Sequence, residues 1–301
     1  MKKSKTMIIC FLLPDLIFFV FVFLYPICRT ILMSFFKISG VTDAISKWTF
    51  VGMGNFTKLF ETSLFMTSLW NIFRIWLIGG FIVMALALLF AVILTSGIRF
   101  KSFYRAAIYM PNVVSAVALA TMWLQYVYNS RFGLFKTIFT ALHLKGLAAI
   151  QWTDNAHKFW ALLIAYCFGM VGYHMLIFAS GIERISEEYF EAATLDGANK
   201  VKQFWYVTLP LIKGVFKTNI TMWSVTSVGF FLWSQLFSTV TADTQTITPM
   251  VYMYTQVFGA GNSVTEHNAG MGAAVGVILS ICVVIIFAVT NKLLKDDDLE
   301  F

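Results

Sequence analysis

Residues 186–210, SEEYFEAATLDGANKVKQFWYVTLP, form a polar stretch between two long apolar segments near residues 158–181 and 207–236. Its charged side chains are costly to place in the hydrocarbon of a bilayer. The segments on either side are long enough to cross a bilayer as helices. The stretch therefore predicts a water-exposed connection between two membrane-spanning helices.

Composition indicates a membrane protein along the whole chain. Of the 301 residues, 59% are hydrophobic and 12% are charged, which leaves too little polar surface for a soluble globule. The apolar runs are continuous rather than alternating, so we expect helices and not the strands of a membrane barrel. We predict an all-α fold, a polytopic membrane helical bundle with six transmembrane helices. The predicted spans lie near residues 7–36, 68–97, 103–128, 158–181, 207–236 and 269–294.

Lys and Arg near the span ends set the expected orientation. Three lysines precede the first span, and three basic residues lie in or beside the short loop after the second. These are Lys2, Lys3, Lys5, Arg99, Lys101 and Arg105. Both groups favour the cytoplasm, so with six spans both termini and the 186–210 stretch are expected there. Loops that are then assigned to the outside also hold basic residues, namely Lys37, Lys47, Lys58, Arg131, Lys136 and Lys145.

The 186–210 stretch predicts two short helices. Ser186 is suited to cap the first, and Glu187 and Glu188 then lie at the positive end of the helix dipole. Gly197 tolerates the left-handed conformation that ends helices, so the first helix should stop there. A second helix is expected to run on to Pro210, whose missing N–H is not needed in the first turn of the next span.

The first of these helices is suited to docking. Ala192 and Ala193 let another protein approach the helix backbone closely, and Glu191 offers a charge to a basic partner. The alternative is an ordinary amphipathic connector at the membrane surface. That alternative explains neither the position of Gly197 nor the Leu-Pro end of the stretch.

The fixed points of the stretch have a specific spacing: Glu-Ala-Ala, three residues, Gly, nine residues, an aliphatic residue, one residue and Leu-Pro. With this spacing the chain resembles the inner-membrane permease subunits of ABC importers. In that family the loop holds a coupling helix, here between the fourth and fifth transmembrane helices, that sits in a cleft of a cytoplasmic ATPase subunit. The resemblance implies coupling through Glu191, Ala192, Ala193, Asp196, Gly197, Leu209 and Pro210.

The resemblance also implies the partners. A second permease subunit in a heterodimer would complete the translocation path, two ATPase subunits would drive it, and an extracytoplasmic sugar-binding protein would deliver the substrate. The chain has no Gly-x-x-x-x-Gly-Lys-Ser/Thr phosphate loop, so partner subunits would hydrolyse the ATP. We expect the chain itself to be no enzyme, with no cofactor and no catalytic or metal-binding residues.

Further motifs resemble the carbohydrate-uptake branch, the permeases of the maltose and multiple-sugar type. They are Leu13-Pro14, Tyr25-Pro26-Ile27, Ser34-Phe35, Val51-Gly52-Met53-Gly54-Asn55-Phe56, Arg105, Pro111, Ser115, Trp123 and Met271-Gly272-Ala273-Ala274. The chain departs from this branch at Thr241-Ala242-Asp243-Thr244-Gln245, where a Gly-Gly-Pro turn is usual. The implied function is ATP-driven uptake of a sugar, and we expect an oligosaccharide, by alternating access.

A sugar site in a bilayer needs aromatic faces and hydrogen-bonding groups that face the bundle interior. The spans beside the 186–210 stretch offer such groups, and the resemblance places these spans on the translocation path. The candidate path residues are Tyr173, His174, Trp223, Thr226, Ser227 and Gln235. Structural roles remain open as well, in helix packing for His174 and in bonds to the preceding backbone turn for Ser224 and Ser227.

Other functional classes remain open. An ion-coupled secondary transporter usually carries acidic residues or broken helices at the bilayer midplane, and no Asp or Glu lies at the centre of a predicted span. Permeases for amino acids and peptides share the loop, so only the other motifs favour a sugar. A membrane enzyme would need a cluster of catalytic residues, and a nucleic-acid-binding protein would need a stripe of basic residues. The sequence shows neither pattern.

No internal repeat, Pro-rich linker or low-complexity block divides the chain, so we expect one permease domain over residues 1–301. The basic start and the long apolar run after it are expected to form an uncleaved anchor, because a small-x-small cleavage site is missing. The expected location is the bacterial plasma membrane, with the chain crossing it several times.

Overall fold

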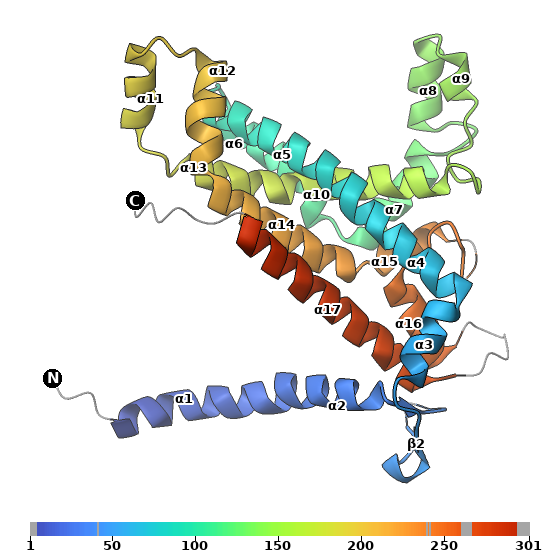
Figure 1. The fold of residues 1–301 in the computed structure, drawn as a ribbon. Coiled ribbons are helices and arrows are strands. Elements are labelled where there is room, and N and C mark those ends of the chain that lie inside the picture. Colours follow the sequence, from blue (N-terminus) through green and yellow to red (C-terminus); the bar gives the residue numbers. More distant parts are fainter. Residues whose placement is uncertain (1–4, 41, 239, 241, 260–266, 294–301) are drawn as a thin grey trace. The chain divides into compact units, whose positions relative to one another are not determined.

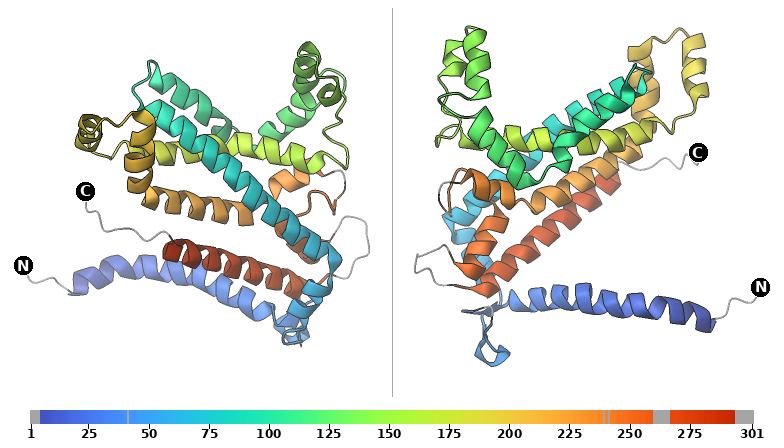
Figure 2. Two further views of the ribbon diagram at one scale, coloured as in Figure 1. Left: turned by 45° about the horizontal axis from the view of Figure 1, so that its top comes forward. Right: turned by 180° about the vertical axis from the view of Figure 1, so that it is seen from behind.

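The computed structural model describes residues 5–40, 42–238, 240, 242–259 and 267–293. Lys2 and Lys3, on which the expected orientation partly rests, lie outside the described residues. The chain forms two compact units, described separately below: residues 1–66 with 252–281, and residues 67–251 with 282–301. Three helices, α4, α16 and α17, run from one unit into the other. Figures 1 and 2 show the elements of each unit.

The first unit begins with a long apolar helix that passes through a π-helical turn, Val20–Leu24. A short antiparallel strand pair follows, with Phe36 opposite Phe50, and is the only strand pairing among the described residues. The elements that lie wholly in this unit are α1 (Lys5–Phe19), α2 (Tyr25–Met33), β1 (Phe36–Lys37), β2 (Thr49–Phe50) and α3 (Gly54–Glu61).

Two buried asparagines hold the first unit together. The Asn55 amide donates to the backbone oxygens of Ser34 (2.8 Å) and Phe36 (2.9 Å). Asn268 donates to the Asn55 side-chain oxygen at 3.0 Å and accepts from the Ile38 amide at 3.3 Å. Because unpaired buried amides are costly, this network fixes residues that lie more than 200 positions apart in the sequence. It gives the Asn of the Val51–Phe56 motif a structural role.

The second unit is a helical bundle around α10. One of its long helices continues from α4 through a π-helical turn, Ile75–Gly79, into α5. The helices of this unit, including those that it shares, are α4 (Ser63–Arg74), α5 (Gly80–Thr95), α6 (Lys101–Val113), α7 (Ala116–Met122), α8 (Leu134–Ala141), α9 (Lys145–Ala148), α10 (Lys158–Ile182), α11 (Glu187–Leu195), α12 (Lys200–Gln203), α13 (Leu209–Leu211), α14 (Lys213–Val228), α15 (Leu232–Phe237), α16 (Pro249–Phe258) and α17 (Ala269–Leu293).

The structure confirms a membrane-type helical fold, but not six continuous spans. In the described residues, four helices are long and apolar enough to cross a bilayer: Phe11–Met33, Ser63–Thr95, Lys158–Ile182 and Ala269–Leu293. A fifth crossing would consist of a pair bent by 98°, Lys101–Val113 with Ala116–Val127. The bend follows Pro111 and lies at Ser115, whose hydroxyl caps α7 by accepting from the Ala118 amide.

The span predicted near residues 207–236 is not one continuous helix. The helix breaks at Ile212, where φ is −97° and ψ is 17°, and again after Val228, before α15 begins at Leu232. The piece between the breaks, α14, has 16 residues, and it includes Lys213, Lys217 and several hydroxyl side chains. Apolar content alone does not report such breaks, because it averages over the whole segment.

Small residues let neighbouring helices approach α10 and α14 closely. At Gly172 in α10, a Cβ would lie 2.3 Å from the Ile108 carbonyl oxygen of α6. At Gly80 in α5, a Cβ would lie 2.7 Å from Nε1 of Trp223, the largest fully buried side chain among the described residues. The Trp223 indole also donates to the Trp76 carbonyl at 2.9 Å. Helices α5, α6, α10 and α14 are therefore packed in close contact with one another.

Gly172→Ala should destabilise the second unit. The added methyl group would press on the α6 backbone, which cannot rotate away as a side chain can, and overpacking of this kind costs about 1–3 kcal/mol. Thermal unfolding in detergent should show a lower Tm. Gly146→Ala in α9 is the matched control, because a Cβ added there would meet nothing within 4 Å. Equal Tm values for the two variants would contradict the packing described here.

Candidate functional site

The stretch after α10 forms a short helix at the predicted place. Helix α11 covers Glu187–Leu195, with Ser186 at the N-cap position, although the Ser186 side chain makes no capping hydrogen bond. The helix ends at Gly197, which has a φ of +77°. The Gly197 amide donates to the Thr194 carbonyl (3.0 Å) and the Ala198 amide to the Ala193 carbonyl (2.9 Å). This pair of bonds is a Schellman motif, and its left-handed residue favours glycine.

The second predicted helix is present in three parts. Asn199 caps α12, with its side-chain oxygen accepting from the Lys202 amide at 2.9 Å. A π-helical turn, Phe204–Thr208, connects α12 to α13, and Pro210 lies in the first turn of α13. The chain therefore returns to the bundle through continuous helical turns from Lys200 to Leu211, with Leu209 half-buried and Pro210 exposed.

Gln203 ties the two arms of this hairpin together. Its side chain is buried, and Nε2 donates to the Thr194 hydroxyl (2.8 Å) and to the Ala198 carbonyl (3.2 Å). The Thr194 hydroxyl in turn donates to the Phe190 carbonyl at 2.7 Å. Sequence reasoning missed Gln203, because one glutamine beside two lysines gives no sign that it is buried.

The hairpin exposes the residues predicted to couple. Glu191, Ala192, Asp196 and Gly197 are exposed, and Ala193 is half-buried. Leu195 is 90% exposed, which is unusual for a large apolar side chain at the end of a helix. Figure 1 shows α11 and α12 together beyond the end of α10, away from α8 and α9. The hairpin thus exposes apolar and acidic side chains, and the buried side chain of Gln203 holds its two arms together.

An ion cluster joins the start of α6 to the end of α10. The Glu183 carboxylate accepts from Lys101 Nζ at 2.6 Å and from Arg105 at 2.7 Å. The hydrogen bond from Lys101, with help from Arg105, holds the pKa of the Glu183 carboxyl below its usual value. Two basic residues that were predicted to share one membrane face with the 186–210 stretch therefore lie at the same end of α10.

Among the candidate path residues, His174 of α10 and Trp223 and Ser227 of α14 are buried, and Tyr173 is half-buried. The His174 Nδ1 atom lies 2.7 Å from the Asn219 side-chain oxygen, and its ring is 5.9 Å from that of Trp223 and 5.1 Å from that of Tyr173. The Nε2 atom of His174 has no hydrogen-bond partner among the described residues, and neither has the buried hydroxyl of Ser227. Both atoms are fully buried, so a ligand could reach them only if the bundle opened.

The other candidate path residues are in different surroundings. Trp223 is held by Gly80 and the Trp76 carbonyl, so the structure gives it a packing role. Thr226 is exposed and bonds the carbonyls of the preceding turn. Gln235 lies apart on α15, and among the described residues its Nε2 atom is buried without a partner. The six candidates therefore do not form one site, and their role in the path stays a prediction.

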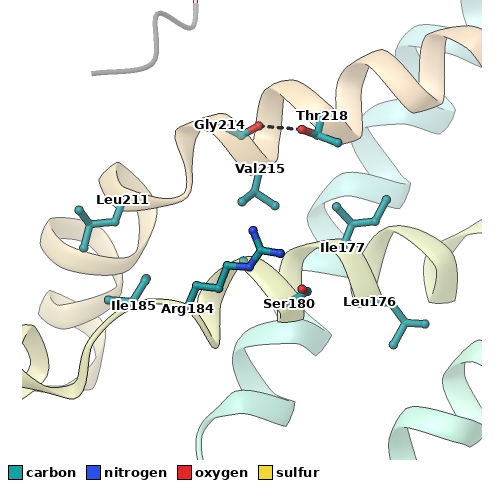
Figure 3. Close-up of a pocket in the computed structure, with 10 residues that line it drawn as sticks. Leu176, Ile177, Ser180, Arg184, Ile185, Leu211, Gly214, Val215 and Thr218 are labelled. Atoms are coloured by element: carbon teal, nitrogen blue, oxygen red, sulfur yellow. Dashed lines mark hydrogen bonds between the residues drawn. The ribbon is translucent and has the colours of Figure 1, made fainter. Parts of the chain in front are cut away.

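A groove of about 590 Å³ lies between the last turns of α10 and the start of α14, next to the hairpin. Figure 3 shows Arg184, Ile185 and Leu211 at the end nearer the loop, and Ile177 with Thr218 farther along the two helices. The groove is mainly apolar, and none of the six candidate path residues lines it. Its position places an open surface between the two helices that flank the hairpin.

A buried ion pair at the other end of α10 was also missed. The Lys158 ammonium lies 2.6 Å from an Asp243 carboxylate oxygen, and both side chains are almost fully buried. Asp243 belongs to residues 241–245, where the sequence departs from the Gly-Gly-Pro turn implied by the resemblance. Its second carboxylate oxygen accepts from the Gln245 amide at 3.0 Å. The departure from the usual motif therefore introduces a charge that fixes this loop to the start of α10.

Comparison with known proteins identifies the family. A model of the family described as "Binding-protein-dependent transport system inner membrane component" matches residues 84–295, more than half of the chain. The chain belongs to this family. The match includes all of the hairpin and the helices on both of its sides. The permease is thus an inner-membrane component of a transport system, and the sequence-based prediction of its family is confirmed.

Several relatives have described transport roles. The arabinooligosaccharides transport system permease protein AraP of Halalkalibacterium halodurans is 28% identical over 280 residues, which cover 91% of this permease and 83% of the relative. The diacetylchitobiose uptake system permease protein NgcF of Streptomyces coelicolor is 27% identical over 294 residues, with coverage of 94% and 80%. The resemblance to carbohydrate-uptake permeases is borne out by these names.

Solved structures share the fold. A chain in the crystal structure of a bacterial ABC transporter involved in import of the acidic polysaccharide alginate matches with a TM-score of 0.79 and 16% identity. The match covers 98% of this permease and 96% of that chain. A second crystal structure, of the alginate transporter in complex with an alginate pentasaccharide-bound periplasmic protein, matches with a TM-score of 0.78 and 16% identity, covering 97% and 94%. The permease therefore has the fold of an ABC-transporter chain.

Gln203→Ala should loosen the hairpin. Removal of the amide leaves the Thr194 hydroxyl and the Ala198 carbonyl without this donor, at a cost of about 1 kcal/mol. Hydrogen exchange of backbone amides in residues 187–203 should then accelerate by about fivefold. Lys202→Ala, which removes the adjacent exposed side chain, should leave exchange unchanged. Equal protection in both variants would show that Gln203 does not hold the two arms together.

Glu183→Gln should give a pH-dependent loss of stability. A carboxyl whose folded pKa is lowered contributes stability that is present above its unfolded pKa, about 4.3, and is lost as the pH falls through the folded value. The variant should therefore have a lower Tm than the parent at pH 6, and the difference should shrink toward pH 3. Glu188→Gln, at an exposed carboxylate of α11, is the control. A difference independent of pH would exclude the ion cluster as its cause.

Proposed function

We propose that this chain is one permease subunit of an ATP-driven ABC importer and forms half of the translocation path for an oligosaccharide. The α11 hairpin carries this proposal, because it presents Glu191, Ala192 and the exposed Leu195 on a helix closed by Gly197. Membership of the transport family and the arabinooligosaccharide and diacetylchitobiose systems of the relatives support it.

In this proposal α11 is the coupling helix and docks in a cleft of a cytoplasmic ATPase subunit. Gln203 makes the two arms of the hairpin move together, and the helical turns through Leu209 and Pro210 carry displacement into α14. The other arm joins α10 directly after Glu183. Closure of two ATPase subunits would thus move the two helices on either side of the groove, which is the motion that alternating access needs.

The partners follow from the same proposal. A second permease subunit completes the path as a heterodimer, two ATPase subunits hydrolyse the ATP, and an extracytoplasmic sugar-binding protein delivers the substrate. The periplasmic protein in the complex with the structurally similar alginate transporter supports a partner of this last kind. The permease subunit itself performs no chemical step.

The proposed topology is a single transmembrane domain, residues 1–301, with six crossings and both termini in the cytoplasm. The bent pair α6 and α7 supplies the third crossing, and α14 with α15 supplies the fifth. The ion cluster of Glu183 with Lys101 and Arg105 supports one membrane face for the two loops predicted to be cytoplasmic. The membrane concerned is the bacterial plasma membrane.

The proposed path includes Tyr173, His174, Trp223, Thr226, Ser227 and Gln235. Within this set, His174 and Ser227 have buried polar atoms without partners among the described residues, so they are best placed to bind sugar hydroxyls as the path opens. Trp223 shapes the path by packing between α5 and α14.

Gly197→Asp and Glu191→Lys should each release the ATPase subunit while the second permease stays bound. The first forces a side chain into a left-handed conformation, and the second reverses the charge of the docking helix. Each is expected to weaken ATPase binding by about tenfold or more, which is about 1.4 kcal/mol. Affinity purification of the tagged chain from native membranes, followed by quantification of the partners, measures this. Gly146→Asp in α9 is the control and should retain both partners.

Transport in vesicles distinguishes this proposal from an ion-coupled transporter. Vesicles that contain the reconstituted complex should take up oligosaccharide only with ATP and the binding protein present. Uptake under a proton or sodium gradient by the chain alone, without ATP, would exclude the importer. ATP-driven uptake of an amino acid but of no sugar would retain the importer and exclude the proposed substrate class.

A further inference from the structure

An amphipathic hairpin lies at the end of α10 opposite α11. Helices α8 and α9 lie side by side there and stand out from the bundle in every view of Figures 1 and 2. The hairpin follows the helical turn Trp123–Val127 and returns to the start of α10. The coupling role proposed above makes no use of it.

One face of the hairpin is fixed to the rest of the second unit by aromatic contacts. The Phe135 ring of α8 lies 5.9 Å from that of Trp123, 5.5 Å from Tyr128 and 5.4 Å from Trp152. The Tyr128 hydroxyl donates to the Ala161 carbonyl at 2.8 Å, within the first turns of α10. Its base is therefore held at the level where the candidate span Lys158–Ile182 begins.

A neighbouring side of α8, next to Phe135, is apolar and uncovered. Leu134, Ile138 and Leu142 are spaced by four residues, so they share one side of the helix and its C-cap, and they are 53%, 41% and 61% exposed. Phe132, Leu144 and Leu147, elsewhere in the hairpin, are also exposed. Exposed apolar side chains that gather on one side of a helix mark an interaction surface.

The charges of the hairpin are all positive. Residues 129–153 contain Arg131, Lys136 and Lys145 but no Asp or Glu. All three side chains are exposed, and Lys136 also donates to the Ser130 carbonyl at 2.6 Å. Basic residues in a short loop predicted to be extracytoplasmic depart from the usual charge bias of membrane proteins. An apolar face flanked by basic residues is the pattern of helices that lie in a membrane interface and attract anionic lipid headgroups.

Aromatic residues at the base mark the same level. Tyr126, in the turn before the hairpin, is 67% exposed, and Trp160, in the first turn of α10, is 46% exposed. Exposed Trp and Tyr side chains gather where a membrane protein passes from hydrocarbon to headgroups. The apolar face of α8 is therefore attached to the bundle at the depth of an interface, not beyond it in water.

We infer that the hairpin of residues 131–147 is an interfacial membrane anchor. Leu134, Ile138 and Leu142 insert among the upper acyl chains of one leaflet, and Arg131 and Lys145 contact the phosphates of anionic phospholipids. The assignment to the outer leaflet rests on the proposed function, since it requires α11 to be cytoplasmic. The insertion of the hairpin into one of the two leaflets does not rest on the proposed function.

The test uses an environment-sensitive fluorescent amino acid, introduced by codon suppression into the full chain. One variant carries it at Ile138 on the apolar face, and the matched control carries it at Thr140, an exposed position on the other face of α8. Both are reconstituted in vesicles of phosphatidylglycerol and phosphatidylcholine with brominated acyl chains. The probe at Ile138 should be blue-shifted and quenched by brominated lipid at least twofold more than the probe at Thr140. Aqueous iodide should quench the two in the reverse order.

Charge is tested with Arg131→Gln and Lys145→Gln combined. Lipid quenching at Ile138 should fall in vesicles that contain phosphatidylglycerol and stay unchanged in pure phosphatidylcholine. Two results would overturn the inference: equal iodide quenching at both positions, or protection at Ile138 that develops only when the extracytoplasmic binding protein is added. The same probe at Leu195 reports the side of α11. Lipid quenching at Ile138, with the probes at Thr140 and Leu195 reached by iodide from the same side, would retain the anchor and overturn the proposed topology.

Discussion

Close packing around α10 is the constraint on which the second unit depends. In the hydrocarbon of a bilayer, helices lack the hydrophobic driving force that water provides. Their association therefore depends on close packing. Gly172 lets α6 approach α10 at backbone distance, and Gly80 admits the indole of Trp223 between α5 and α14. These contacts hold α10 firmly against its neighbouring helices. Each end of α10 carries a hairpin: α11 follows its last turn, and α8 with α9 precedes its first turn.

The two ends are built by different means. The α11 hairpin is held by its own backbone, through the Schellman bonds at Gly197 and the side chain of Gln203. These bonds tie the hairpin into one unit, as the proposed docking role of α11 requires. The start of α10 is instead fixed by the buried pair of Lys158 with Asp243. Breaking that pair would leave a buried charge uncompensated, so this end is suited to remain still while the other is displaced.

Features with a local cause were predictable from the sequence. The spacing around Glu191 and Gly197 indicated the helix, its end and the family, because capping and left-handed turns depend on nearby residues. Pairings across long distances were not predictable. Asn55 with Asn268 and Lys158 with Asp243 leave no periodic signal. The breaks at Ile212 and after Val228 were missed because hydropathy measures composition, not backbone geometry. For the candidate path, residue type alone did not distinguish Trp223, which is packed in the bundle, from His174 and its unpaired nitrogen.

The most direct test of the central claim is site-specific photo-cross-linking at Leu195 in native membranes. A photoreactive amino acid at this position, the most exposed large apolar side chain of the hairpin, should form a covalent adduct with an ATPase subunit. The same group at Leu142, on the hairpin at the other end of α10, should form none. An adduct from Leu195 alone would establish that α11 docks on the ATPase subunit. Adducts from neither position, or from both, would contradict the account.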